Sequence, residues 1–172
     1  VFSGVGWVNG ASATETRPVP EENPLRLSAI TANAEDVLGF EVAAGRAFDD
    51  RDTANPIDRP VLLTYQAWQR RFRGSGHVLK LTWVDGPLTY RVIGVLPSGF
   101  LLPSSRLLER IDGVYGFRSS GQARRGALAT APFARLRPGV SIGAARAVAE
   151  SATAMDWEAT EGQPNSARGQ TV

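Results

Sequence analysis

An aromatic and arginine-rich stretch, YQAWQRRFRGSG at residues 65–76, is the part of the chain whose residue types most readily suggest chemistry. Stacking on aromatic rings, with arginines on phosphates, is a common way to hold single-stranded nucleic acid. On a helix, however, Tyr65, Trp68 and Phe72 share one face, because they are spaced i, i+3 and i+7. This spacing predicts a helix that buries its aromatic residues, while the arginines keep their charged groups in water. We therefore expect Trp68→Ala to cost roughly 3–5 kcal/mol if the ring is buried and Arg71→Ala to be nearly silent.

The only histidine of the chain, His77, is the single candidate for an imidazole base. A Ser-His-Asp site needs a positioned imidazole, and no G-x-S-x-G nucleophile motif accompanies it. His77 is therefore predicted to be a surface or loop-anchoring residue with no catalytic role.

A group of carboxylates between residues 49 and 60 has the composition of a cation-binding loop. A calcium loop that began at Asp50 would need Gly at its sixth position and Glu at its twelfth, but Asn55 and a valine stand there. Arginines also lie among the carboxylates and would neutralise them. We expect a solvated loop in which carboxylates cap backbone groups; the acidic residues are Asp49, Asp50, Asp52 and Asp58.

Other patterns carry weaker signals. The glycine-rich stretches at 4–10 and 74–76 lack the lysine of a phosphate-binding loop. Glu35 and Asp36 are adjacent and are expected to favour a helix N-terminus. The pair Arg124/Arg125 is predicted to be exposed in a loop. No catalytic, cofactor-binding or metal-binding residue is assigned, which favours an interaction or structural module over an enzyme.

Composition indicates a folded domain with a core of its own. The 172 residues are 42% hydrophobic, and 19 cationic against 17 acidic residues give a net charge of only +2. Scattered arginines and a near-neutral charge argue against a nucleic-acid binder. The absence of cysteine excludes disulfides and thiolate metal sites. No apolar run approaches the ~18 residues of a membrane helix, and both ends look cut, so we expect a piece of a longer protein.

Local patterns alternate between strands and helices. The turn Asp85-Gly86 joins two alternating segments as a hairpin, Thr64 and Gly74 are expected to bound the aromatic helix, and Ser141 to cap the last helix. That helix is expected to bury a stripe of Ile142, Ala145, Val148, Ala152 and Met155. Strands are predicted at 25–31, 61–64, 78–84, 88–96, 113–117 and 127–137, and helices at 33–39, 65–73 and 142–155. The pattern predicts an α+β fold, a mixed sheet with helices on one face.

Four segments in order resemble a known family, the MacB-like periplasmic core domain of ABC transporter permeases of the FtsX-like type. They are LSAITANAEDVLGFEVAAGRAFDDRD, RPVLLTYQAWQRRFRGSGHVLKLTWVDGPLTYRVIGVLPSGF, FARLRPGVSIGAARA and the tail QPNSARGQTV. The resemblance covers residues 25 to about 155. It implies a porter-like subdomain at 25–75 and 127–172, a smaller β-rich subdomain inserted at 76–126, and an irregular lead-in at 1–24.

The resemblance also implies a function. It predicts a non-catalytic, extracytoplasmic domain of a membrane-embedded permease, without cofactor, that relays conformational change or contacts substrate or partners during export. A cytoplasmic ABC ATPase would act through the parent permease, and a periplasmic protein or a second permease copy would be further partners. A soluble ligand- or lipid-binding module is the alternative. Binding of nucleic acid, the third hypothesis, would have to weaken steeply with salt.

Overall fold

The computed structural model describes residues 1–9, 14–17, 23–55, 57–102, 111–117 and 130–161. The chain forms two compact units, one of residues 4–135 and one of residues 1–3 with 136–172. Each unit is described by itself below.

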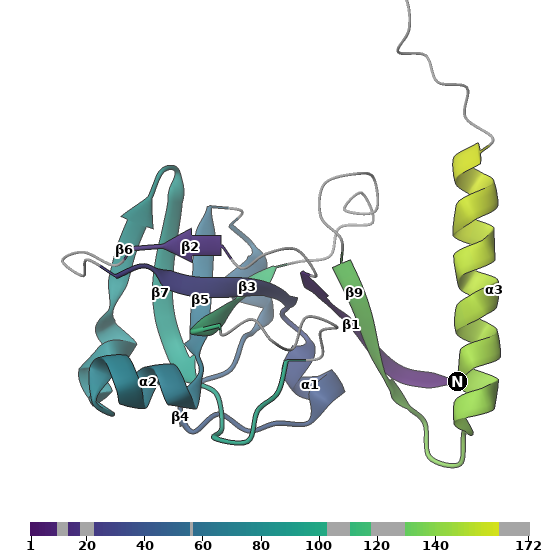
Figure 1. Cartoon of the computed structure of the whole chain (residues 1–172), viewed down its shortest axis with the longest axis horizontal. Coiled ribbons are helices and arrows are strands. Elements are labelled where there is room, and N and C mark those ends of the chain that lie inside the picture. Colours follow the sequence, from purple (N-terminus) through teal and green to yellow (C-terminus); the bar gives the residue numbers. More distant parts are fainter. Residues whose placement is uncertain (10–13, 18–22, 56, 103–110, 118–129, 162–172) are drawn as a thin grey trace, which may run out of the picture. The chain divides into compact units, whose positions relative to one another are not determined.

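One mixed sheet forms the larger unit (Figure 1). The strand order is β4-β7-β5-β8-β3-β1-β9, with β2 also paired to β3 and β6 also paired to β7. Strands β3 and β8 run parallel, as do β5 and β7, whereas β5 and β8 run antiparallel. The α+β class predicted from the sequence is confirmed. The strands are β1 (Phe2–Asn9), β2 (Thr14–Thr16), β3 (Leu25–Thr31), β4 (Ala44–Gly45), β5 (Asp58–Leu63), β6 (Thr82–Asp85), β7 (Leu88–Val95), β8 (Gly113–Phe117) and β9 (Thr130–Leu136).

The first two strands lie in the stretch that was expected to be irregular. In β1 the residues alternate between exposed and inward positions, with Val8 fully buried and Val5 exposed. Glycines at inward positions hide this period of two from a hydrophobicity count, and that is why the pattern was missed.

Both faces of the sheet are buried, because side chains alternate along each strand. In β5, Leu62 belongs to one hydrophobic cluster, while Val61 and Leu63 belong to the other. Helix α1 (Ala34–Leu38) packs into the first cluster through Val37, and helix α2 (Tyr65–Phe72) packs on the second. The short helices therefore cover opposite faces of the sheet, where the sequence suggested a single covered face.

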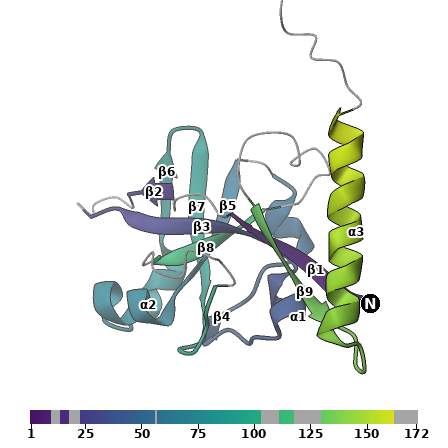
Figure 2. The ribbon, with the colours of Figure 1, turned by 45° about the vertical axis from the view of Figure 1, so that its right-hand side comes forward.

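The sheet curls around the second cluster, so that two strands from its opposite sides meet. The buried Trp83 of β6 donates a 2.8 Å hydrogen bond from Nε1 to Oγ1 of the buried Thr16 in β2. The Trp83 ring also stacks on Tyr90, with centroids 5.1 Å apart. Both views draw β2 beside β6 (Figures 1 and 2). A polar bond between two buried side chains thus draws the margins of the sheet together.

Helix α2 forms as its sequence predicts. The Thr64 hydroxyl accepts a 3.2 Å bond from the Ala67 N–H, and Arg73, with φ of 53°, ends the helix one residue before the expected glycine. The three aromatic side chains are half-buried against the second cluster. The Trp68 indole also donates a 3.0 Å bond to the Ser75 carbonyl.

The segment after α2 differs from its prediction. Residues Gly76–Lys80 form a 3₁₀ helix, η2, and the strand begins only at Thr82. The Ser75 hydroxyl caps η2 by accepting from the His77 N–H at 3.3 Å, so local capping prevails over the apparent alternation of side chains.

The hairpin that follows is shifted by one residue from the prediction. Asp85 pairs with Leu88, so Gly86 and Pro87 are the turn residues. Gly86 has a positive φ of 57°, and Pro87 cannot adopt one. This combination suits a type II′ turn, which requires positive φ only at its first central position.

The smaller unit contains helix α3 (Ile142–Glu161). Ser141 caps it by accepting from the Ala144 N–H at 3.2 Å, as predicted. The predicted buried stripe is not observed over the positions that can be compared, because Ile142 is 80% exposed and Val148 is 42% exposed, although Ala145 is buried. The side chains of the stripe beyond residue 151 lie outside those described. In the part of the chain that the structure describes, no helix has the length and apolar character needed to cross a membrane.

Candidate interaction surface

The described residues contain no group of three or more His, Asp or Glu side chains arranged to hold a metal ion. His77 is exposed, as predicted, and its backbone N–H serves the cap of η2. The prediction for Arg124 and Arg125 falls outside the described residues. The search for a site therefore turns from catalysis to surfaces and to the contacts that hold them.

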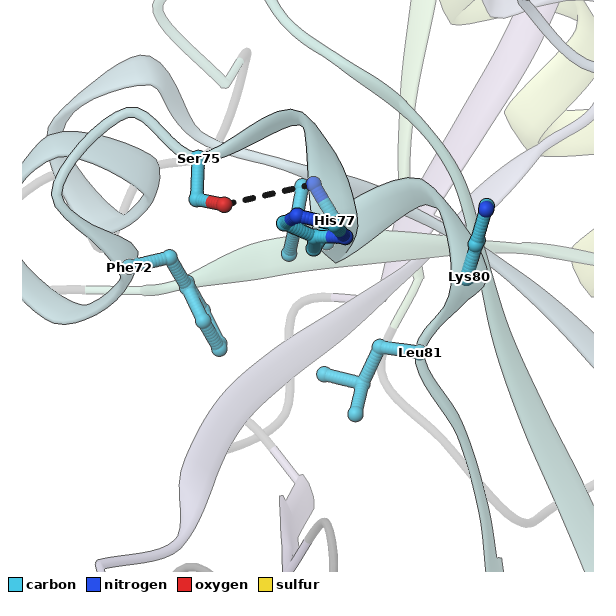
Figure 3. Close-up of a pocket in the computed structure, with 6 residues that line it drawn as sticks. Phe72, Ser75, His77, Lys80 and Leu81 are labelled. Carbon is cyan, nitrogen blue, oxygen red and sulfur yellow. Dashed lines mark hydrogen bonds between the residues drawn. The ribbon is translucent and has the colours of Figure 1, made fainter.

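A shallow hollow lies where α2 ends and η2 begins (Figure 3). Its volume is about 430 Å³. Phe72 and Leu81 point toward the same space, and the buried Val78 also lines it. The other lining residues are Ser75, His77 and Lys80. An apolar floor beside an exposed imidazole and an ammonium group suits an apolar side chain of a partner that has a carboxylate nearby.

The acidic loop is a capping structure, as the sequence suggested. Asp49 caps the 3₁₀ helix η1 (Asp50–Thr53), and the Asp52 carboxylate accepts in return from the Asp49 N–H at 2.9 Å. A side-chain hydrogen bond from Arg51 is the main cause that lowers the pKa of Asp49 to about 2. Burial raises the pKa of Asp52, but hydrogen bonds from Arg46 and from the Asp49 backbone outweigh it, so the net shift is downward. Guanidinium and backbone groups thus occupy the oxygens that a cation would need.

Glu35 and Asp36 lie in the first turn of α1, as predicted. Burial raises the pKa of Glu35, and the charges of Asp36 and Glu41 add to this effect. The side chain of Asn33 does not cap this helix; it donates instead to the Val5 carbonyl at 2.8 Å.

The two arginines at the end of α2 turn inward to one carboxylate. Arg71 donates from Nη1 to Asp112 Oδ2 at 2.8 Å and to the Pro24 carbonyl at 2.9 Å, and from Nη2 to the Asn23 carbonyl. Arg70 donates from Nη2 to Asp112 Oδ1 at 2.6 Å. The Arg71 side chain is only 11% exposed, against 43% for Arg70. The expectation that Arg71 is dispensable is therefore contradicted by its contacts.

Asp112 is the centre of this arrangement. Its carboxylate accepts from the Arg26 N–H at 3.1 Å, and its own N–H donates to the Arg26 carbonyl at 2.7 Å. Its carbonyl accepts from the Thr64 N–H at 2.8 Å. One buried residue thus fastens α2 to the starts of β3 and β8 and to the end of β5. Sequence reasoning missed Asp112, because its partners lie about 40 to 90 residues away in the chain.

The chain matches the family described as MacB-like periplasmic core domain over residues 2–152. No curated protein sequence matches it.

Three solved structures share its fold. The periplasmic region of MacB from Actinobacillus actinomycetemcomitans has a TM-score of 0.59 and 17% identity; the match covers 94% of this chain and 69% of that one. A domain of a putative permease protein from Porphyromonas gingivalis has a TM-score of 0.59 and 14% identity, over 91% and 64%. The extracellular domain of the noncanonic ABC-type transporter YknZ from Gram-positive bacteria has a TM-score of 0.57 and 19% identity, over 88% and 77%.

At these identities the structures establish the fold, while the family match covers most of the chain and includes three of the four segments on which the resemblance was based, all but the tail. The chain therefore belongs to the MacB-like periplasmic core domain family of ABC transporter permeases, as the sequence motifs predicted.

Proposed function

We propose that this chain is a non-catalytic domain on the outer face of the membrane in an ABC-type permease, and that it relays movement between the membrane-embedded part and proteins outside. The family match over residues 2–152 is the observation that carries this proposal. A cytoplasmic ATPase would supply the energy through the parent permease. A periplasmic protein or a second permease copy would receive the movement.

The contacts of Asp112 support a role as a relay. A domain transmits displacement only when its elements do not slide against one another. Helix α2 has eight residues and is too short to be stable by itself, so its position depends on tertiary contacts. Arg70 and Arg71 hold it to the sheet on one side, and its aromatic side chains pack on the second cluster. Movement applied at α2 would therefore be passed to the strands.

The alternative, a ligand- or lipid-binding module, has less support. Side chains of the chain itself make up both hydrophobic clusters. The hollow at α2 and η2 is shallow and open, and it suits one side chain better than an enclosed ligand.

Distance measurements in the reconstituted permease with its ATPase test the relay. Because the 172 residues contain no cysteine, cysteines at the exposed positions Gln66 and Val84 place two spin labels within the domain. We expect the distance between these labels to be equal with ATP and with ADP, while the distance from either label to one in the membrane part changes. Asp112→Asn should broaden the first distance and weaken the second change. The relay would be refuted if the distance between the membrane part and the domain were the same with ATP and with ADP.

A further inference from the structure

A second hollow lies where the curled sheet fails to close. It has a volume of about 450 Å³ and separates β2 from β6, which belong to opposite sides of the strand order. The bond between Trp83 and Thr16 fixes the inner side of this gap. We call it the β2–β6 seam, the hollow lined by Glu15, Thr16, Arg17, Pro24, Val84 and Asp85.

The outer edge of β6 presents backbone groups to the seam. In an antiparallel pair, residues alternate between those bonded to the partner strand and those whose N–H and C=O point away from it. The Val92 N–H of β7 donates to the Leu81 carbonyl at 3.0 Å. Because bonded positions recur every two residues, Trp83 is the next residue of β6 whose backbone groups bond to β7. Thr82 and Val84, which face Arg91 and Thr89 in the register, therefore direct their backbone groups away from β7.

The edge of β2 faces the seam in the same way. The N–H and the C=O of Arg26 in β3 both bond to Asp112, which lies on the side of β3 that faces β8. Leu25 and Leu27 must then bond toward β2, where they face Thr16 and Thr14. Glu15, between these two positions, directs its N–H and C=O outward. Among the strand pairings of the described residues, β2 pairs only with β3 and β6 only with β7.

Native proteins usually protect such an edge with charge or with an inward-pointing polar residue. The centre of β6 instead carries Val84, which is 63% exposed and β-branched. A valine exposed beside unpaired backbone groups favours the addition of another strand. The residues that line the hollow include two carboxylates, Glu15 and Asp85, and one guanidinium, Arg17. The Glu15 carboxylate already lies 3.8 Å from Nε of Arg26, so Asp85 is the carboxylate left for a basic group of the segment.

We propose that the β2–β6 seam binds an extended segment of a partner protein, which adds as a strand to the open edge of β6. The segment pairs its backbone with Thr82 and Val84 and lays an apolar or β-branched side chain against Val84. A basic side chain next to it in the segment points to the opposite face, the face of Asp85, and reaches the Asp85 carboxylate. The proposal depends on the strand geometry and charges of the seam, so it stands or falls independently of the transport role.

A defined peptide tests the proposal on the whole 172-residue chain. The probe is an acetylated and amidated hexapeptide, TVKVTV, with a second version in which Glu replaces the Lys. Residue-resolved hydrogen exchange should show fast exchange at the amides of Thr82 and Val84 in the free chain and slow exchange at Trp83. Saturating TVKVTV should slow the Val84 amide by roughly tenfold or more, and the Glu version should bind at least about tenfold more weakly.

Two blocks distinguish strand addition from other binding. Val84→Pro removes an N–H that points into the seam but breaks no hydrogen bond to β7, so the chain should still fold while it no longer binds the peptide. Val84→Thr keeps this N–H and should bind the peptide normally. If Val84→Pro unfolds the chain, N-methylation of alternate residues of the peptide makes the same test on the unaltered protein. The proposal is overturned if Val84 is already protected in the free chain, if neither peptide protects it, or if the methylated peptide binds equally well.

Discussion

Replacement of Arg71 by alanine is the sharpest test of how this domain is held together. The guanidinium donates hydrogen bonds to the Asp112 carboxylate and to the Pro24 and Asn23 carbonyls, and its side chain is 11% exposed. Hydrogen bonds to charged groups contribute about 1.5–3 kcal/mol each, and breaking a buried ion pair costs about 3–5 kcal/mol. Asp112 would keep its bonds from Arg70 and from the Arg26 N–H, which compensates part of this cost. We expect a loss of about 2–4 kcal/mol.

The neighbouring arginine provides a matched control. Arg70 makes one bond to the same carboxylate, but its side chain is 43% exposed, so Arg70→Ala should cost at most about 1 kcal/mol. Urea unfolding at neutral pH measures both. With a slope of about 2 kcal/mol per molar, Arg71→Ala should lower the midpoint by about 1–2 M. Equal midpoints for the two variants, or an Arg71→Ala midpoint within about 0.2 M of the unaltered chain, would refute the reasoning.

Three further outcomes are expected. Trp68→Ala should cost about 2–3 kcal/mol in the same urea assay, since the ring is half-buried and its indole N–H bonds the Ser75 carbonyl. Gly94→Ala should lower the free energy of unfolding by about 3 kcal/mol, because a Cβ at this position would lie 2.5 Å from a backbone oxygen. Gly99→Ala is its control and should change the stability little, because a Cβ at Gly99 would meet no atom within 4 Å. The pKa of Asp49 lies near 2, below its unfolded value, so its contribution is complete above pH about 4 and lost as pH falls toward 2; a carboxyl NMR titration with a midpoint near 4 would contradict this.

Patterns within a few residues predicted much of the fold. The helix α2, its Thr64 cap, the hairpin and the Ser141 cap all depend on neighbours in sequence, and the structure has them close to where they were expected. The errors there are small: η2 replaces the first residues of a strand, because Ser75 caps it, and Pro87 moves the turn by one residue.

Contacts between distant residues were not predictable in this way. Asp112 bonds Arg71 across 41 positions and Arg26 across 86, and Thr16 bonds Trp83 across 67. No period or spacing encodes such pairs, because they depend on how strands from both ends of the sequence are ordered in the sheet. The same order buries both faces and places α1 and α2 on opposite sides, which helical periodicity alone cannot specify.

The aromatic and arginine-rich stretch illustrates how this order decides function. For single-stranded nucleic acid, rings must be free to stack and guanidinium groups free to reach phosphates. Here the three aromatic side chains pack against the second cluster, and Arg70 and Arg71 bond a carboxylate of the same domain. A phosphate would have to displace Asp112 and detach α2 from the strands that it fastens. The residue types that suggested a nucleic-acid surface instead attach a short helix to the sheet, and such an attachment is what the relay proposed above would require.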